Sequence, residues 1–143
     1  MKNSKKHWLW NIVIVLTLVL VAIAFLMHYK NWIKVEDNQF KILSGIYYKK
    51  LDFADINTVE MVDKIPSLER INGFSVSETE KGVFRDSIYN TDVYIFVDKL
   101  SKQKIKVTYR DSLQLFFNVS DSLETEKMYT MFSHKIDSLS SVK

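Results

Sequence analysis

The sequence has 143 residues, of which 26% are charged and 47% hydrophobic, and it contains no cysteine. This length gives room for one domain of ordinary size beside a targeting or membrane segment. The lack of cysteine excludes disulfide bonds, thiolate metal sites and a cysteine nucleophile.

The positive charge is concentrated near the N-terminus. The formal net charge is +3, yet all 17 Asp and Glu residues lie from Glu36 onward. Residues 36–143 hold 15 basic against 17 acidic residues, which gives them a net charge of −2. We therefore expect no nucleic acid partner. The basic residues that precede Glu36 are Lys2, Lys5, Lys6, Lys30 and Lys34.

The first predicted element is a membrane-spanning helix at residues 8–29, after a short tail of residues 1–7. The run from Trp8 to Met27 contains no charged residue, and an α-helix of that length reaches about 30 Å, the hydrocarbon thickness of a bilayer. Aromatic residues flank the run, as is common at membrane interfaces. The sequence thus predicts a single-pass cell-membrane protein that contacts the lipid bilayer through residues 8–29. The expected interface anchors are Trp8, Trp10, Tyr29 and Trp32.

A cleavable signal peptide is the alternative interpretation of this segment. The early lysines resemble a basic n-region, and Ala22-Ile23-Ala24 has the small-x-small form of a cleavage site. The apolar run continues to Met27, however, and exceeds the usual h-region, so we favour an uncleaved signal anchor. The lysine cluster before the span favours an extracytoplasmic domain, although the count is nearly balanced by the lysines that follow, namely Lys30, Lys34 and Lys41.

Beyond a juxtamembrane connector at residues 30–38, the pattern predicts mainly strands. In residues 104–109, Ile105, Val107 and Tyr109 alternate with polar residues, which indicates a strand with one buried and one solvated face. A partner strand follows after a short turn. The expected strands are residues 40–43 and 46–51 as a hairpin, 58–65 before Pro66, 83–84, 87–89, 92–97, 104–109 and 113–119, with a turn at 52–56.

The last segment has the period of a helix. Asp121 with Glu124 forms a predicted capping box. Apolar residues then recur at spacings of three and four, so they share one helical face. We therefore predict an α+β fold in which about seven strands form a strongly bent antiparallel sheet or partial barrel, with one C-terminal helix, in a domain of residues 39–143. The apolar face consists of Tyr129, Phe132, Ile136 and Leu139.

Several short motifs are spread over residues 38–136. They are the pair Asp55-Ile56, Pro66, Arg70-x-Asn72-Gly73-Phe74, Gly82-x-Phe84-Arg85, Asn118 and Tyr129. With these motifs the chain resembles a membrane-attached bacterial pleckstrin-homology-like (PH-like) domain. The resemblance implies seven strands in two nearly orthogonal sheets, a C-terminal helix that closes one end, and a binding module without catalytic residues.

Two of the three glycines, Gly73 and Gly82, lie within residues 70–85. The pair Asn72-Gly73 favours a turn with positive φ, so we expect a long ordered loop between strands. Arg70 and Arg85 frame this loop and either pair with nearby carboxylates or contact a partner. The candidate binding residues here are Arg70, Asn72, Gly73, Phe74 and Arg85.

A second group of candidate binding residues consists of lysines. Residues 91–110 have five basic and two acidic residues, which gives this segment a net charge of +3. One interpretation is a solvated hairpin whose lysines protect an edge strand, and the other is contact with anionic lipid headgroups. The lysines are Lys99, Lys102, Lys104 and Lys106.

Little in the sequence points to catalysis. His134 is the one histidine beyond the membrane segment, and Asp52 and Asp55 fit a solvated turn better than an acid–base pair. We expect no catalytic residue, metal, cofactor or small-molecule substrate. The predicted function is a non-catalytic, membrane-anchored binding module for a protein partner or for self-association. The alternatives are a sensor of anionic lipid headgroups at Lys99–Lys106 and, less favoured, a small membrane-linked enzyme.

Overall fold

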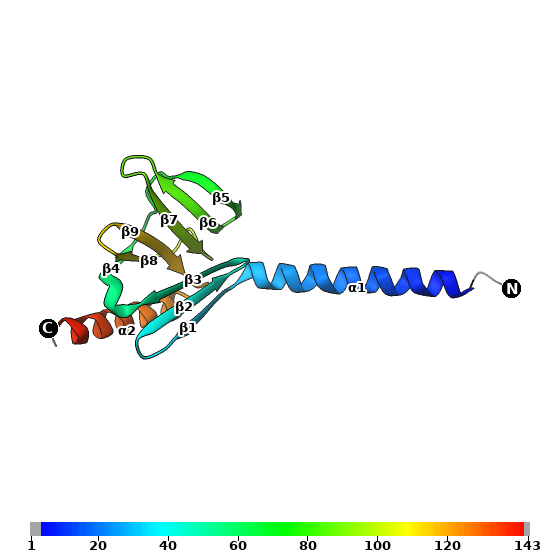
Figure 1. Ribbon diagram of the computed structural model, residues 1–143, viewed down its shortest axis with the longest axis horizontal. Coiled ribbons are helices and arrows are strands. Elements are labelled where there is room, and N and C mark those ends of the chain that lie inside the picture. Colours follow the sequence, from blue (N-terminus) through cyan, green and yellow to red (C-terminus); the bar gives the residue numbers. More distant parts are fainter. Residues whose placement is uncertain (1–3, 142–143) are drawn as a thin grey trace.

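The computed structural model describes residues 4–141, and Lys2 of the predicted tail lies outside them. Helix α1 (Ser4–Tyr29) projects away from a domain that is built from strands and a C-terminal helix (Figure 1). The other elements are β1 (Asn31–Val35), β2 (Gln39–Ser44), β3 (Tyr47–Asp52), the 3-10 helix η1 (Phe53–Asp55), β4 (Ile56–Val62), β5 (Glu69–Val76), β6 (Thr79–Asp86), β7 (Thr91–Val97), β8 (Lys104–Tyr109), β9 (Leu113–Asn118) and α2 (Ser122–Ser140).

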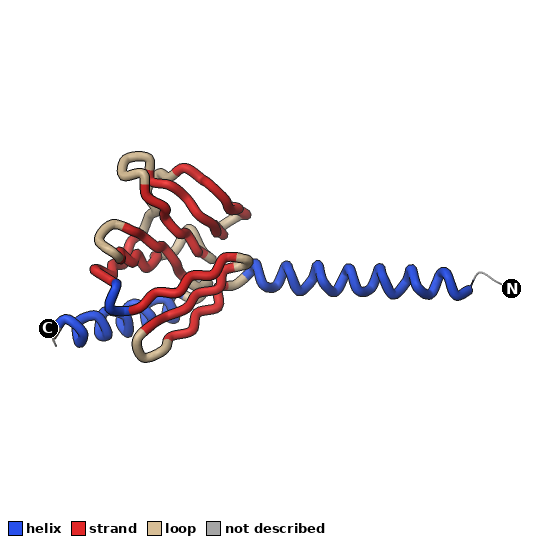
Figure 2. Tube along the Cα trace, viewed as in Figure 1, coloured by secondary structure: helices blue, strands red, loops and turns tan. Residues whose placement is uncertain are grey.

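The N-terminal helix is long and apolar enough to cross a membrane from His7 to Met27, and none of that stretch is buried. The helix begins at Ser4, so the last residues of the predicted tail are helical. Trp8 and Trp10 are exposed on it, while the side chain of Tyr29 lies outside the described residues. The first strand follows the helix after a single residue, Lys30 (Figure 2).

The strands form two sheets, one with the order β1-β2-β3 and one with the order β4-β8-β9-β7-β6-β5. This confirms the α+β class and the C-terminal helix. The expected seven strands are too few, because the described residues form nine. The sheets are also not purely antiparallel. Strand β9 returns from β8 to lie between β8 and β7, and it therefore runs parallel to β7.

The expected connector at residues 30–38 is wrong. Residues 31–35 form β1, which pairs with β2 from Asn31↔Ser44 to Val35↔Phe40. Only Lys30 separates α1 from this strand. The domain thus begins directly at the end of the helix, without a flexible linker.

The expected loop at residues 70–85 is also wrong, because this stretch is the hairpin of β5 and β6. Gly73 lies opposite Gly82 within the paired strands, and the turn falls later, at Ser77, which has a φ of 53°. Gly73 does have a positive φ, of 155°, but inside a strand next to an irregularity in register. Residues 87–89, predicted as a strand, form the turn between β6 and β7.

The main core lies between the two sheets and under α2. Its centre is a group of phenylalanine rings, in which Phe132 of α2 lies 4.8 Å from Phe40 and 5.4 Å from Phe53, measured between ring centroids. Asp121 is the N-cap of α2, but its carboxylate accepts a hydrogen bond of 2.9 Å from the Leu123 amide and not from the Glu124 amide that the predicted capping box would engage. Tyr129 and Ile136 pack at the edge of this core, whereas Leu139 is 42% exposed.

A smaller core covers the opposite face of the six-stranded sheet. Phe84, Val93, Ile95, Val97 and Phe116 are buried there, beneath the segment that connects β4 to β5. The alternation predicted for β8 is correct, but its second face is not fully solvated. Lys104 is only 2% exposed, because its stem lies over this core and its amine donates hydrogen bonds to the carbonyl oxygens of Asp63 and Leu100.

Candidate functional site

Several buried polar side chains lie together at the end of the domain next to α1. Phe25, in the last turns of the apolar run, lines a pocket of about 470 Å³ together with Val76 and Ser77 of the β5–β6 turn. Ser44, at the end of β2, pairs with Asn31 at the start of β1. We call this region the membrane-proximal end.

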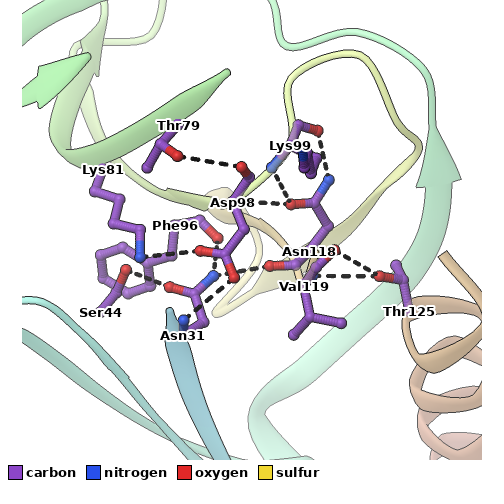
Figure 3. A network of polar contacts seen from close by, with 10 residues as sticks. All are labelled: Asn31, Ser44, Thr79, Lys81, Phe96, Asp98, Lys99, Asn118, Val119 and Thr125. Carbon is purple, nitrogen blue, oxygen red and sulfur yellow. Dashed lines mark hydrogen bonds and ion pairs between the residues drawn. The ribbon is translucent and has the colours of Figure 1, made fainter. Parts of the chain in front are cut away.

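Asn31 joins the end of α1 to the six-stranded sheet (Figure 3). Its side-chain amide donates hydrogen bonds to the carbonyl oxygens of Phe96 at 2.6 Å and Asn118 at 2.8 Å. Its backbone N–H donates to the carboxylate of Asp98 at 3.2 Å, and its side-chain oxygen accepts from the hydroxyl of Ser44. Asn31 is 2% exposed, so these bonds satisfy groups that water does not reach.

Behind Asn31 lies a buried ion pair between Lys81 of β6 and Asp98, which follows β7. The Lys81 ammonium lies 2.9 Å from Oδ1 of Asp98, and the side chains are 0% and 1% exposed. Neither atom makes an aligned hydrogen bond within the described part of the chain, so the contact is electrostatic. Burial lowers the pKa of Lys81, and Asp98 opposes that shift.

Asn118, at the end of β9, fixes the loop that carries Asp98. Its side-chain oxygen accepts from the amides of Asp98 at 2.9 Å and Lys99 at 3.1 Å. Its amide donates to the carbonyl oxygens of Lys99 at 2.8 Å and Gln103 at 3.1 Å. All of its polar atoms are thus used to hold the chain around the ion pair, and the side chain is pre-positioned rather than free for a ligand.

The chemistry of this cluster is structural. A general acid, base or nucleophile must reach a substrate, and the Lys81 and Asp98 side chains are sealed from solvent. The network instead links β1, the first strand after α1, to β7 and β9 of the other sheet and, through the Lys81–Asp98 pair, to β6. Asn31, two residues beyond the end of α1, is therefore tied to the core of the domain.

A second lysine with a perturbed environment lies between the sheets. The Lys49 ammonium is 4.0 Å from the ring centroid of Tyr94 and 5.2 Å from that of Tyr109. Burial lowers the pKa of Lys49, and it raises the pKa of Tyr109 to about 12. Tyr109 therefore stays protonated near neutral pH, and the arrangement is a cation–π contact that fills the gap between the sheets.

The candidates around residues 70–85 do come together, on one hairpin, but as cross-strand contacts. Arg70 lies 3.5 Å from Glu80 and over the ring of Phe84, and Arg85 lies 3.0 Å from Asp92. Both arginines are near half exposed, at 44% and 46% of their side-chain surface. The remaining candidates are also engaged: the amide oxygen of Asn72 accepts from the Tyr47 hydroxyl, Gly73 faces Gly82, and Phe74 lines the pocket beside Phe25.

The four candidate lysines at residues 99–106 do not form one exposed basic patch. Lys104 is buried, as described above. Lys99 lies 3.4 Å from Glu78, and Lys106 lies 3.1 Å from Glu60. Lys102 is exposed in the loop before β8.

Sequence reasoning did not identify Asn31, Lys81 and Asp98. A signal was present in part, since Asp98 and Asn118 each end an apolar run. Asp98 and Asn118 meet because β7 and β9 are parallel neighbours. The pairing of Val97 with Asn118 shows that the carboxyl ends of the two strands lie at the same edge of the sheet. Only the strand order reveals that juxtaposition.

The chain matches no protein family model, and comparisons with curated proteins and with solved structures found no significant match. The described residues contain no group of three or more His, Cys, Asp or Glu side chains that could hold a metal ion. The interpretation of the site therefore depends on its own geometry.

Proposed function

We propose that the protein is a single-pass membrane protein whose domain is a non-catalytic binding module at the membrane surface. Helix α1 is the anchor, the domain lies outside the cytoplasm, and the partner is a protein or a second copy of the chain. The observation that carries this proposal is the junction at Asn31. A helix suited to a bilayer leads, after one residue, into a strand that is bonded to both sheets.

Such a junction suits a module that must hold a fixed height and direction at a membrane. A flexible linker would let the domain sample many orientations, at the expense of pre-organisation for binding. Here the first residue of the first strand is buried and makes four polar contacts. The junction therefore keeps the domain close to the bilayer and restricts its range of orientations.

The turn between β6 and β7 supports a protein partner. Ile88 is 85% exposed and Tyr89 is 71% exposed, although both are large apolar side chains. The Asp86 carboxylate accepts hydrogen bonds from the amides of Ile88 at 2.8 Å and Tyr89 at 3.2 Å, so the turn is held in one shape. The turn lies at the end of β6 that is farther from α1 (Figure 1). Rigid, exposed apolar anchors are typical of protein-binding surfaces.

The alternatives have less support. A headgroup sensor at Lys99–Lys106 needs exposed lysines, yet Lys104 is buried and two others have acidic partners. A small enzyme needs reactive groups that a substrate can reach, and the Lys81–Asp98 pair is sealed. The PH-like assignment stays a prediction. It is consistent with two sheets and a C-terminal helix, but the nine strands and the parallel β7–β9 pair differ from the implied pattern.

The anchor prediction concerns the full chain in its native membrane. We expect it to remain at full length in the membrane fraction after extraction with alkaline carbonate, because about 20 apolar residues of α1 would otherwise be exposed to water. Fractionation and N-terminal sequencing test this. A mature N-terminus at Phe25 would instead show that Ala22-Ile23-Ala24 is cleaved as part of a signal peptide.

The partner prediction concerns the β6–β7 turn. A photo-crosslinking residue at Ile88 is expected to give a discrete crosslinked product in the membrane, either a dimer of the chain or an adduct with another protein. The control is the same residue at Lys127, which is exposed on α2. Mass spectrometry of the products tells the two kinds of partner apart. Equal crosslinking at both positions would argue against a partner at this turn.

A further inference from the structure

The outer face of the three-stranded sheet is divided into rows of different chemistry. The first row consists of neighbours across the strands, since Trp32 pairs with Leu43 and Leu43 pairs with Tyr48. We call Trp32, Leu43 and Tyr48 the apolar row. The next residues on the same face form the lysine row, in which Lys41 pairs with both Lys34 and Lys50. Beyond it, Gln39 pairs with Asp52.

The apolar row is exposed although two of its members are large aromatic residues. Trp32 is 59% and Tyr48 is 58% exposed, and a shallow hollow of about 290 Å³ lies between them and the lysines. The residues that alternate with them, such as Phe40 and Ile42, are completely buried in the main core. The sheet therefore has a conventional inner face and an outer face whose apolar end is exposed. Ile46, in the adjoining β2–β3 turn, is a further 73% exposed.

The rows are ordered by their distance from α1. Trp32 follows the last residue of α1 by three positions, so the apolar row lies where the helix leaves the bilayer. Two residues of a strand span about 7 Å, so the lysine row lies up to about 7 Å farther from the membrane than the apolar row. The headgroup region of each leaflet has a similar thickness, about 5–8 Å. With α1 in a bilayer, this order would place the apolar row at the boundary of the hydrocarbon and the lysine row near the phosphates.

The charge of the face fits an anionic surface. Glu36 lies 3.2 Å from Lys34 and 2.7 Å from Lys41, and it offsets one of the three positive charges of the lysine row. Within the described residues, Lys50 has no carboxylate within 4.0 Å. The row keeps a net positive charge next to the membrane, and the acidic Asp52 lies farther out. Aromatic residues at the hydrocarbon boundary with lysines outside them suit an anionic leaflet.

From this order we infer that the outer face of the three-stranded sheet docks onto anionic phospholipid headgroups of the bilayer that α1 crosses. The apolar row enters the interface and the lysine row contacts the phosphates. This inference rests on the proposed function, because α1 must first place the domain at the membrane. It assigns lipid contact to lysines other than the group at residues 99–106, and it leaves the turn at Ile88 free for a protein partner.

The test uses the full chain in vesicles. Because the chain lacks cysteine, Tyr48→Cys provides a unique site for an environment-sensitive fluorophore, and Ile88→Cys provides a matched site on the distant turn. Quenching by lipids that carry a nitroxide near the headgroup is compared between phosphatidylcholine vesicles and vesicles that also contain phosphatidylglycerol. We expect the Tyr48 probe to be quenched more strongly in the anionic vesicles, and the Ile88 probe to be quenched weakly in both.

Matched lysine variants then test the role of the lysine row. Lys50→Gln is expected to lower the ratio of docked to undocked domain by about five-fold in anionic vesicles, since a lysine at an anionic surface contributes a term of that size. Lys127→Gln removes the same charge from α2 and is expected to leave the ratio unchanged. An equal effect of both variants, or equal quenching of the Tyr48 probe in the two kinds of vesicle, overturns the docking surface.

Three further outcomes separate this inference from the proposed function. If the Tyr48 probe is shielded in detergent as protein concentration rises, a second copy covers the face and the lipid assignment is wrong. If the chain stays inserted after alkaline extraction but its Tyr48 probe is unquenched, only the docking surface fails. A chain that leaves the vesicles altogether refutes the anchor, and with it both proposals.

Discussion

Asp98→Ala is expected to lower the free energy of unfolding of the domain by about 3–5 kcal/mol. The substitution leaves the ammonium of Lys81 buried at 0% exposure with no counter-charge. It also removes the acceptor for the backbone N–H of Asn31. An uncompensated buried charge costs far more than the loss of a surface contact. Thermal or denaturant unfolding of the full chain in detergent, followed by circular dichroism, measures the change.

Two controls separate the buried pair from ion pairs in general. Glu60→Ala breaks the pair with Lys106 on β8, where Glu60 is 53% exposed, and is expected to cost less than about 1 kcal/mol. Lys81→Met combined with Asp98→Asn removes both charges and keeps an acceptor for Asn31. We expect the double variant to be more stable than Asp98→Ala alone, since no lone charge is left behind. A double variant that is less stable than the single one would contradict this account.

The elements that the sequence predicted correctly are those whose pattern is local. Strands β7, β8 and β9 carry alternating or continuous apolar residues, and α2 carries a cap and an apolar stripe. Each of them contributes buried residues to a core. In such segments, the period that identifies the element is the same feature that makes it pack. The hairpin of β2 and β3 is also correct, because Ser44-Gly45 marks the turn between the two strands.

In the elements that the sequence did not predict, the local pattern does not reflect burial in a core. Strand β5 has no buried residue and contains a glycine, so neither periodicity nor propensity marks it as a strand. It exists because β6 offers a partner along its whole length. Strand β1 is short, and the neighbouring apolar run makes it look like the end of a membrane segment. Both segments form strands because they pair with other strands, and the local sequence pattern does not reveal that pairing.

The sequence does not reveal the polar site, because a charged side chain normally indicates exposure. Lys81 and Lys104 are among the most buried side chains, at 0% and 2%. Each is satisfied by groups from elsewhere in the chain: Asp98 for Lys81, and two carbonyl oxygens for Lys104. Burial of a charge depends on such partners, and strand order brings them together. The rows on the outer face likewise depend on the register of β1 with β2.

The second large effect is expected at the glycine pair. Gly82→Ala should lower the free energy of unfolding by about 3 kcal/mol or more, because strain in an unusual backbone region and overpacking both contribute. A β-carbon at Gly82 would lie 2.2 Å from the carbonyl oxygen of Asn72 and 2.5 Å from the Cα of Gly73. These are backbone atoms of the paired strand, which cannot rotate away. Gly82 also has a φ of 150°, which residues with a β-carbon rarely adopt.

Gly45→Ala is the matched control. Gly45 has a φ of 64° in the β2–β3 turn, so its substitution adds a left-handed residue at a cost of about 1–2 kcal/mol. Both variants are measured by unfolding of the full chain in detergent. If Gly82→Ala costs no more than Gly45→Ala, the close approach of β5 and β6 is not a constraint on the fold.

The glycine pair and the buried ion pair are expected to be coupled. Gly82 directly follows Lys81, and the carbonyl oxygen of Lys81 lies 2.4 Å from where a β-carbon on Gly73 would be. Forcing β5 and β6 apart therefore moves Lys81 relative to Asp98. We expect Gly82→Ala and Asp98→Ala together to cost less than the sum of the separate changes, since the first already weakens the contact that the second removes. Strict additivity would mean that β6 accommodates the methyl group without moving Lys81.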